Sequence, residues 1–150
     1  MSQSLSRVVV HGVFSTKNRV PSLNPEILKE LSAYLTTVLA NQGHSPINIG
    51  GHNDHIHVLV GLSRTMTIAK TIEIMKTSTS KWLKTKSPEL ADFCWQLGYG
   101  IFGVSENDVP AVSNYISNQA ENHKTVSFKD EFRALMKKHG IEIDERYAWE

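Results

Sequence analysis

Short stretches rich in β-branched residues alternate with longer stretches that have apolar side chains at helical spacing. This order constrains the fold more than any other feature of the sequence. The segment 7–15 reads as a buried strand. Apolar residues then recur every three or four positions over 25–42, which predicts an amphipathic helix with Asn24 as its N-cap. Segments 47–51 and 55–62 flank a short polar turn and predict a β-hairpin.

The second half of the chain repeats the pattern and then adds helices. The spacing of apolar residues predicts a helix over 67–85, a strand over 95–105, a helix from 107 or 108 to about 123, and a short helix over 127–139. The order strand, helix, strand, strand, helix, strand is the split βαβ pattern. We therefore predict an α+β, ferredoxin-like sandwich. Its four- to five-stranded antiparallel sheet carries two helices on one face and an added C-terminal helix that bears a tyrosine. Residues 1–150 form a single domain in this prediction.

Charge does not by itself indicate a nucleic-acid partner, because the formal net charge is only +1. The bases are unevenly distributed, however, and six of them lie within 64–86 against the single acid Glu73. Local basic segments can follow a phosphate backbone even on a near-neutral chain. A solvated helix face explains the same lysines equally well.

Cys94, the single cysteine, excludes an internal disulfide and fits a reducing compartment. The first seven residues lack the apolar core of a signal peptide. Apolar runs also fall short of the roughly 20 residues that a membrane helix needs. We therefore expect a cytoplasmic protein without a membrane partner.

His55 and His57 are two positions apart on a predicted strand, so their side chains point to the same face. Two neighbouring imidazoles on an accessible sheet face can supply two ligands to one metal ion. Two exposed strand histidines without a ligand would give the same pattern.

Tyr115 and Gln119 are four positions apart on a predicted helix, so they are neighbours on one face. They lie at the shoulder of the apolar stripe. A packed amphipathic ring is the simpler interpretation of Tyr115 alone. The neighbouring amide and the His-x-His strand together favour a functional interpretation.

Four segments in this order resemble one known family. They are 13–21 (VFSTKNRVP), 54–59 (DHIHVL), 95–100 (WQLGYG) and 115–119 (YISNQ). Together they resemble the single-tyrosine HUH transposases of small insertion sequences and the related REP-associated tyrosine transposases. The resemblance extends from about Val8 to the acidic tail, which is nearly the whole chain.

This resemblance implies both the chemistry and the residues that perform it. His55, His57 and Gln119 would bind a divalent metal, and Tyr115 would be the nucleophile. The reaction would cut single-stranded DNA and leave a covalent 5′-phosphotyrosine and a free 3′-hydroxyl, which can later reverse the reaction at a new site.

The implied ligand set is chemically coherent. A phenol with a pKa near 10 is almost fully protonated at neutral pH, and a divalent ion offsets charge that develops during attack on phosphate. Two imidazoles and an amide add no negative charge, so the ion stays electrophilic. Because Mg²⁺ prefers oxygen ligands, Mn²⁺ would suit this set at least as well. Asp54 is a candidate for orienting a histidine, although a turn residue is its simpler interpretation.

The resemblance also implies partners. Enzymes of this kind are dimers in which the tyrosine helix of one subunit completes the metal site of the other, and they recognise single strands partly through imperfect hairpins. Lys17, Asn18 and Arg19 are candidates for contacting the DNA backbone. The other five histidines receive no role, and packing is the simpler interpretation for His123.

Other protein classes fit the sequence less well. A histidine-triad hydrolase would need a histidine where Leu59 stands, a relaxase is longer, and an RRM-type module would need an aromatic strand pattern that is missing. A host-domesticated HUH nuclease would share every catalytic residue, and a non-catalytic single-stranded nucleic-acid-binding module of the same fold also stays open.

Overall fold

The computed structural model describes residues 2–150. Its centre is a four-stranded sheet in the order β2-β3-β1-β4, and every pairing is antiparallel. The strands are β1 (Val9–Ser15), β2 (Ser45–His52), β3 (His55–Gly61) and β4 (Gly100–Val104). The predicted ferredoxin-like order is therefore confirmed, with four strands in the sheet.

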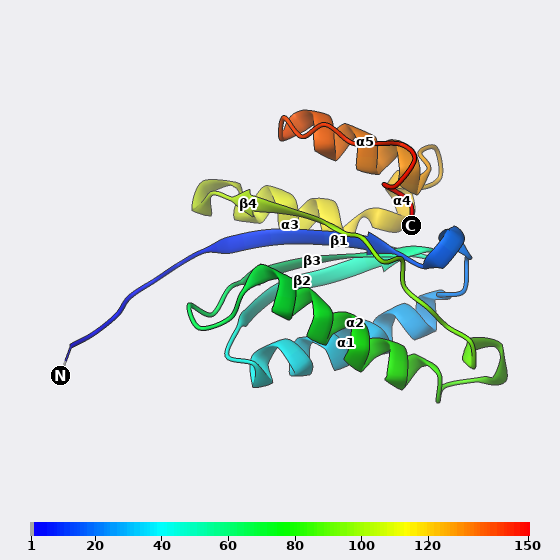
Figure 1. Cartoon of the computed structure of the whole chain (residues 1–150), viewed down its shortest axis with the longest axis horizontal. Helices are drawn as coiled ribbons and strands as arrows, with labels where there is room; N and C mark the ends of the chain where they lie inside the picture. The colour runs from blue at the N-terminus through cyan, green and yellow to red at the C-terminus, as the bar shows by residue number, and fades with distance from the viewer. Residues whose placement is uncertain (1) are drawn as a thin grey trace.

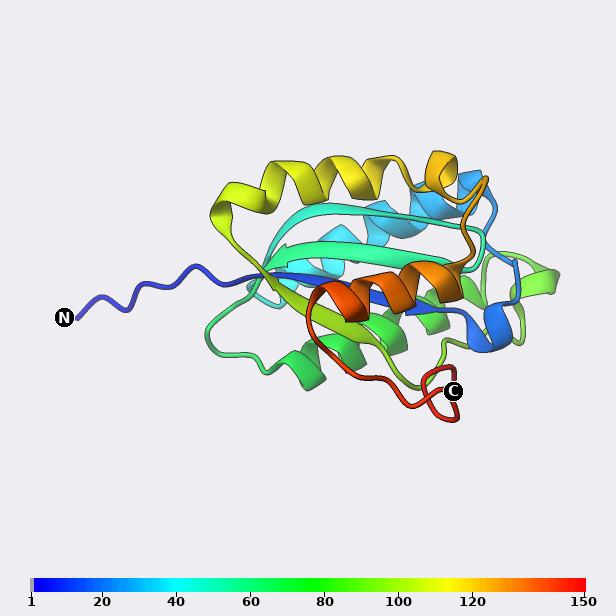
Figure 2. The same cartoon turned by 90° about the horizontal axis from the view of Figure 1, so that it is seen from above.

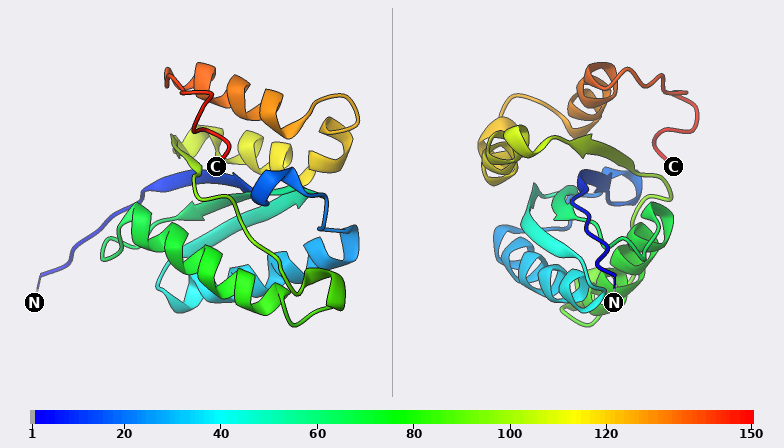
Figure 3. Two further views of the ribbon diagram at one scale, coloured as in Figure 1. Left: turned by 45° about the vertical axis from the view of Figure 1, so that its right-hand side comes forward. Right: turned by 90° about the vertical axis from the view of Figure 1, so that its left-hand side faces the viewer.

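Helices cover both faces of the sheet, so the molecule has three layers (Figure 1 and Figure 3). On one face lie α1 (Pro25–Asn41) and α2 (Ile68–Leu83). On the other lie α3 (Val109–Ser117), α4 (Gln119–Asn122) and α5 (Phe128–Lys138). Three short 3₁₀ turns complete the described part of the chain, residues 2–150: η1 (Lys17–Arg19), η2 (Pro88–Leu90) and η3 (Glu106–Asp108). Among residues 2–150, none of the helices is both long and apolar enough to cross a bilayer.

The first two helices form as the sequence predicts. Asn24 caps α1 by accepting a hydrogen bond from the backbone N–H of Ile27 at 2.8 Å, and Pro25 occupies the first helical turn. The face of α1 that carries Leu31 and Leu35 is buried against the sheet. This apolar layer gives the domain its main core, and the polar site lies on the other face of the sheet.

The fourth strand is shorter than predicted. Lys76 of α2 donates its ammonium protons to the carbonyl oxygens of Gln96, Leu97 and Gly98 at 2.7, 3.0 and 2.7 Å. These carbonyls turn towards a lysine and are lost to the sheet ladder. Only an isolated bridge between Thr16 and Trp95 precedes β4.

The predicted helix to about residue 123 breaks at Asn118, whose φ and ψ of −101° and 21° separate α3 from α4. The next helix, α5, forms as predicted and lies across β1 and β4 (Figure 2). Its apolar side packs in a second core cluster. That cluster contains Val13, Phe102, Phe128, Phe132 and Met136. The second face of the sheet is thus covered.

Gly50 allows α3 to approach β2 closely. A Cβ atom at this position would lie 2.7 Å from the carbonyl oxygen of Ile116, which is backbone and cannot rotate away. We expect Gly50→Ala to lower the free energy of unfolding by about 1–3 kcal/mol, because α3 must shift to accommodate the methyl group. Urea denaturation followed by circular dichroism measures this change.

Gly103→Ala is the matched control, since a Cβ at Gly103 of β4 would meet no described atom within 4 Å. Equal losses of stability in the two variants would show that close contact with α3 is not what Gly50 provides.

Candidate active site

A polar cluster lies between the second sheet face and the helices above it. β3 is buried on both faces of the sheet, and its side chains point alternately to one face and the other. Ile56 and Val58 belong to the apolar core beneath α1 and α2, and His55 and His57 point to the opposite side, as predicted. Both histidines have 0% of their surface exposed. The prediction that they lie on an accessible face is therefore wrong, because α5 packs over them and sets the Phe128 ring 4.8 Å from that of His55.

Tyr115 of α3 and Gln119 of α4 reach the same cluster from the helices that cover this sheet face. α3 is tied to β2 by Asn48, whose amide donates to the carbonyl oxygen of Ser113 at 2.9 Å and to Ser117 Oγ at 3.0 Å. This anchoring directs the Tyr115 hydroxyl across the sheet face. Gln119 is fully buried, and its Oε1 lies 2.7 Å from Nε2 of His55. The predicted nucleophile and the three predicted metal ligands thus meet within one chain.

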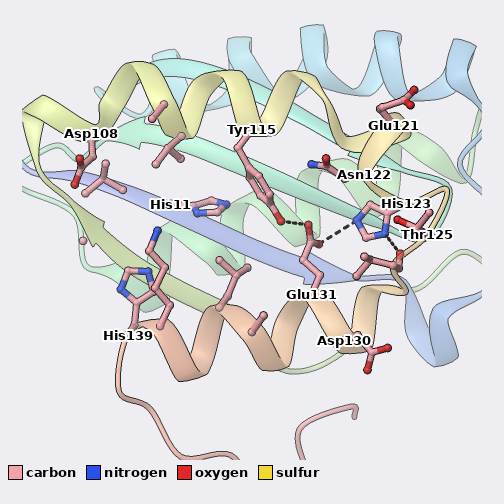
Figure 4. Close-up of a pocket in the computed structure, with 18 residues that line it drawn as sticks. His11, Asp108, Tyr115, Glu121, Asn122, His123, Thr125, Asp130, Glu131 and His139 are labelled. Carbon is pink, nitrogen blue, oxygen red and sulfur yellow. Dashed lines mark hydrogen bonds and ion pairs between the residues drawn. The ribbon is translucent and has the colours of Figure 1, made fainter.

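One carboxylate, that of Glu131 on α5, joins these groups, and Figure 4 shows its contact with Tyr115. Its Oε1 lies 3.0 Å from His57 Nε2 and 3.3 Å from His55 Nε2. Its Oε2 accepts hydrogen bonds from the Gln119 amide at 2.9 Å and from the Tyr115 hydroxyl. Sequence reasoning missed Glu131. The available signal was an acid in the middle of the apolar stripe of a helix.

His123 also belongs to this cluster. Its Nε2 lies 2.9 Å from Gln119 Oε1 and 3.2 Å from Glu131 Oε1, and its Nδ1 lies 2.6 Å from the carbonyl oxygen of Val126. Figure 4 shows its ring turned towards Glu131. The His123 side chain is buried, as the packing interpretation expects, but packing alone does not explain its polar contacts with Gln119 and Glu131.

The Nδ1 atoms of His55 and His57, which point away from Glu131, each lie within hydrogen-bonding distance of another side chain. Asp54 Oδ1 lies 2.8 Å from His55 Nδ1, and His11 Nε2 lies 2.7 Å from His57 Nδ1. Asp54 lies in the turn between β2 and β3, so it is a turn residue and also a partner of His55. These contacts direct the Nε2 atoms of both rings towards Glu131.

Comparison with known proteins decides the family. Residues 4–119 match the family described as "Transposase IS200 like". The chain belongs to this transposase family. The resemblance seen in the motifs is thereby confirmed, and the chain is a transposase, a class of enzyme that cuts DNA. The family match ends at Gln119, so α5 and Glu131 lie beyond it.

Two solved structures share the transposase fold. One is a proposed transposase from Deinococcus radiodurans R1, with 21% identity over 79% of this chain and 98% of that chain, and a TM-score of 0.62. The other is a REP-associated tyrosine transposase bound to a REP hairpin, with 14% identity over 84% of this chain and 76% of that chain, and a TM-score of 0.60. Among curated proteins, none matches the chain.

Burial and charge set the protonation of this transposase site. Burial, together with the neighbouring His57, lowers the pKa of His11 to about 3, so His11 is neutral. Burial works to raise the pKa of Glu131, but the imidazoles of His123 and His57, at hydrogen-bonding distance, outweigh it and hold that pKa well below its usual range. Burial and the Glu131 carboxylate raise the pKa of Tyr115. In the metal-free protein Tyr115 is therefore a neutral phenol beside a charged carboxylate.

The donor set fits a metal ion. The coordinating atoms of His55, His57 and Glu131 all lie within 4.8 Å of one another, and all three residues are buried. Because the Nδ1 proton of His55 is directed at a carboxylate, its Nε2 presents a lone pair towards Gln119 Oε1 and Glu131 Oε1 when the ring is neutral. Lone pairs that face one another in a buried site need a proton or a cation between them.

A cleft of about 920 Å³ between α3, α4 and α5 leads to this cluster and is lined in part by Tyr115, Glu131 and His123 (Figure 4). The wall of this cleft carries Asp130 among several acids, and Lys138 is its one lysine or arginine among the described residues.

The predicted DNA contacts lie at the end of β1. Ser15 pairs with His55 in the sheet, so η1 begins close to the cluster. Lys17 and Asn18 are exposed there. Arg19 is partly buried, and its guanidinium donates to Ser15 Oγ at 3.1 Å and to the carbonyl oxygen of Trp149 at 2.8 Å. Arg19 therefore ties the C-terminal segment to the sheet.

Proposed function

We propose that this transposase cleaves and rejoins single-stranded DNA through a covalent 5′-phosphotyrosine at Tyr115. One observation carries the proposal: a phenol, an amide and two imidazoles from distant parts of the chain converge on one carboxylate. The fold is shared with a REP-associated tyrosine transposase bound to a REP hairpin, which supports a hairpin-containing single strand as the substrate.

We propose that His55, His57 and Gln119 hold a divalent metal, Mg²⁺ or Mn²⁺, and that Glu131 adds a carboxylate oxygen. When bound, the ion supplies positive charge that binds the scissile phosphate and offsets the charge of the attacking oxygen. That charge is needed because burial and Glu131 hold Tyr115 in its neutral form. With at least two nitrogen ligands, Mn²⁺ suits the site at least as well as Mg²⁺.

The covalent step balances without an energy source. The Tyr115 oxygen forms a bond to phosphorus while the bond from phosphorus to the 3′-oxygen breaks. The phenol loses one proton and the departing 3′-oxygen gains one. Glu131 Oε2 already accepts the hydrogen bond of the phenol, so it orients the hydroxyl for this attack. The phosphotyrosine keeps the energy of the ester, so the reverse step can join DNA without ATP.

The chain brings its own tyrosine to its own histidines, since α3 packs on β2 of the same chain. A tyrosine helix shared between subunits is therefore not needed to assemble the cluster. The predicted homodimer stays a prediction, which light scattering of the purified protein tests.

Lys17, Asn18 and Arg19 remain the proposed contacts to the DNA backbone. The acids in the cleft wall make it a poor channel for a phosphate chain, whereas η1 presents exposed polar and basic side chains beside the cluster. We infer that the backbone approaches along η1 and that only the scissile phosphate enters the cleft.

A cleavage assay tests the proposed function. Single-stranded hairpin DNA, incubated with the protein and Mn²⁺, should give a protein–DNA adduct that survives a denaturing gel, and fully duplex DNA of the same sequence should not. Hairpin binding without any adduct would favour a non-catalytic binding module. A host-retained nuclease would give the same adduct, and the genes beside its own would distinguish it from a mobile element.

His11 is expected to support the metal site through His57. In His11→Leu, His57 Nδ1 loses its partner, and we expect affinity for Mn²⁺ to fall by about 10- to 100-fold. His11→Gln keeps an amide that can hydrogen-bond and should bind Mn²⁺ within a few-fold of wild type. Isothermal titration calorimetry measures both affinities, and a His11→Leu variant that binds as wild type would remove this role.

A further inference from the structure

The proposed metal site has more imidazoles around it than the family resemblance implies. We propose that His123 is a third imidazole ligand, so that His55, His57 and His123 bind the metal together with Glu131. This inference deepens the proposed function, because it concerns the same metal. It also assigns two ligands to the part of the chain that follows the family match at residues 4–119.

The orientation of the His123 ring supports ligation. Its Nδ1 lies 2.6 Å from the carbonyl oxygen of Val126, and a carbonyl can only accept a hydrogen bond. The proton of a neutral ring is therefore on Nδ1, and Nε2 presents a lone pair to the cluster. A metal-binding histidine is usually fixed in this way, through a hydrogen bond from its other nitrogen. Asp54 fixes His55 by the same means.

The distances within the cluster also support ligation. Oε1 of Glu131 lies 3.3, 3.0 and 3.2 Å from the Nε2 atoms of His55, His57 and His123. For metal–ligand bonds of about 2.1 Å, ligand atoms at right angles are about 3.0 Å apart. Each of the three nitrogens thus lies at the spacing of a neighbouring ligand from this one carboxylate oxygen. The ligand atoms that all lie within 4.8 Å of one another are those of His55, His57 and Glu131, and His123 Nε2 joins this group through Glu131.

The loop between α4 and α5 places both added ligands. His123 ends α4, Val126 supplies the carbonyl that orients it, and Glu131 follows on the next helix. The ring of His123 also packs 4.5 Å from that of His55 and stacks 5.5 Å from that of His52. A buried ring held by a carbonyl and two neighbouring rings has little freedom to turn away from the site.

Three imidazoles and one carboxylate are a nitrogen-rich set, which favours Mn²⁺, Co²⁺ or Zn²⁺ over Mg²⁺. Besides its proposed role as a metal ligand, Gln119 also orients Glu131, because its amide donates a hydrogen bond to Glu131 Oε2.

Nitrogen NMR of the histidine rings tests the inference directly. The wild-type protein, with ¹⁵N-labelled histidines and no DNA, is titrated with Zn²⁺ as a diamagnetic probe. We expect the Nε2 signals of three rings, those of His55, His57 and His123, to change together and to saturate at one Zn²⁺ per chain. A response confined to His55 and His57 would overturn the inference. This experiment does not depend on the folding of any variant.

A matched pair of variants gives the second readout. His123→Phe keeps a ring but removes the ligand, and we expect affinity for Zn²⁺ to fall at least tenfold. His139→Phe is the control, because His139 is exposed, lines the same cleft and stacks on Phe102 at 4.3 Å. Its affinity should be unchanged.

An unchanged affinity in His123→Phe would also overturn the inference, while leaving the adduct assay of the proposed function unaffected. Conversely, three responding rings in a protein that never forms an adduct would support the metal site and contradict the covalent mechanism.

Discussion

We expect Tyr115→Phe to abolish the proposed covalent protein–DNA adduct and to leave hairpin binding within a few-fold of wild type. The reason is that phenylalanine keeps the ring in its place beside His57, with centroids 5.7 Å apart, but lacks the oxygen that attacks phosphorus. No other hydroxyl is hydrogen-bonded to Glu131 among the described residues. A denaturing gel measures the adduct, and fluorescence anisotropy with a labelled hairpin measures binding.

Tyr147→Phe is the control for this variant, since Tyr147 is 61% exposed and makes no contact with the cluster among the interactions found in residues 2–150. Loss of the adduct in His57→Ala but not in Tyr115→Phe would remove Tyr115 from the role of nucleophile and would require another attacking group.

Loss of the metal is expected to have an effect of similar size. Chelation with EDTA, or the substitution His57→Ala, should slow adduct formation by about a thousandfold, which corresponds to about 4 kcal/mol of lost transition-state stabilisation. His57 is fully buried against Glu131, so its removal takes away a ligand and leaves a cavity that Mn²⁺ alone does not repair. The rate of adduct formation on a single-stranded hairpin measures the effect.

Added Mn²⁺ distinguishes chelation of the wild-type protein from the loss of a ligand in His57→Ala. It should restore the chelated wild-type protein and should not restore His57→Ala. His139→Ala serves as the control histidine, because it lies in the cleft but outside the cluster, and it should react as wild type. Adduct formation at the full rate in protein shown to be free of metal would remove the metal from the proposed mechanism.

Local patterns in the sequence predict much of this transposase. The order of strands and helices follows from apolar periodicity, and the N-cap Asn24 forms as expected. His55 and His57 share a face because side chains alternate along any strand, and Tyr115 and Gln119 are one turn apart. Such relations depend on residues a few positions apart, so the sequence alone is enough to infer them.

Other features arise from contacts between distant segments, which no local pattern encodes. The fourth strand is short because Lys76 of α2 binds the carbonyls that would extend it. The histidines are buried because α5 packs over β1 and β4 through its own apolar stripe. A four-stranded sheet with two helices on one face predicts an exposed second face. Whether that face stays exposed depends on where α5 packs, and the sequence of α5 does not indicate this position.

The sequence by itself therefore determined the order of strands and helices along the chain and the common face of His55 and His57, and it placed Tyr115 one helical turn from Gln119. Only the tertiary structure decided that Glu131, 74 residues from His57 along the chain, lies beside the histidines and Tyr115. It also decided that His11 contacts His57 and that His123 contacts Glu131. The physical reason is that hydrogen bonds in a buried cluster depend on how whole helices pack, whereas the direction of a side chain on a strand or helix depends on backbone geometry alone.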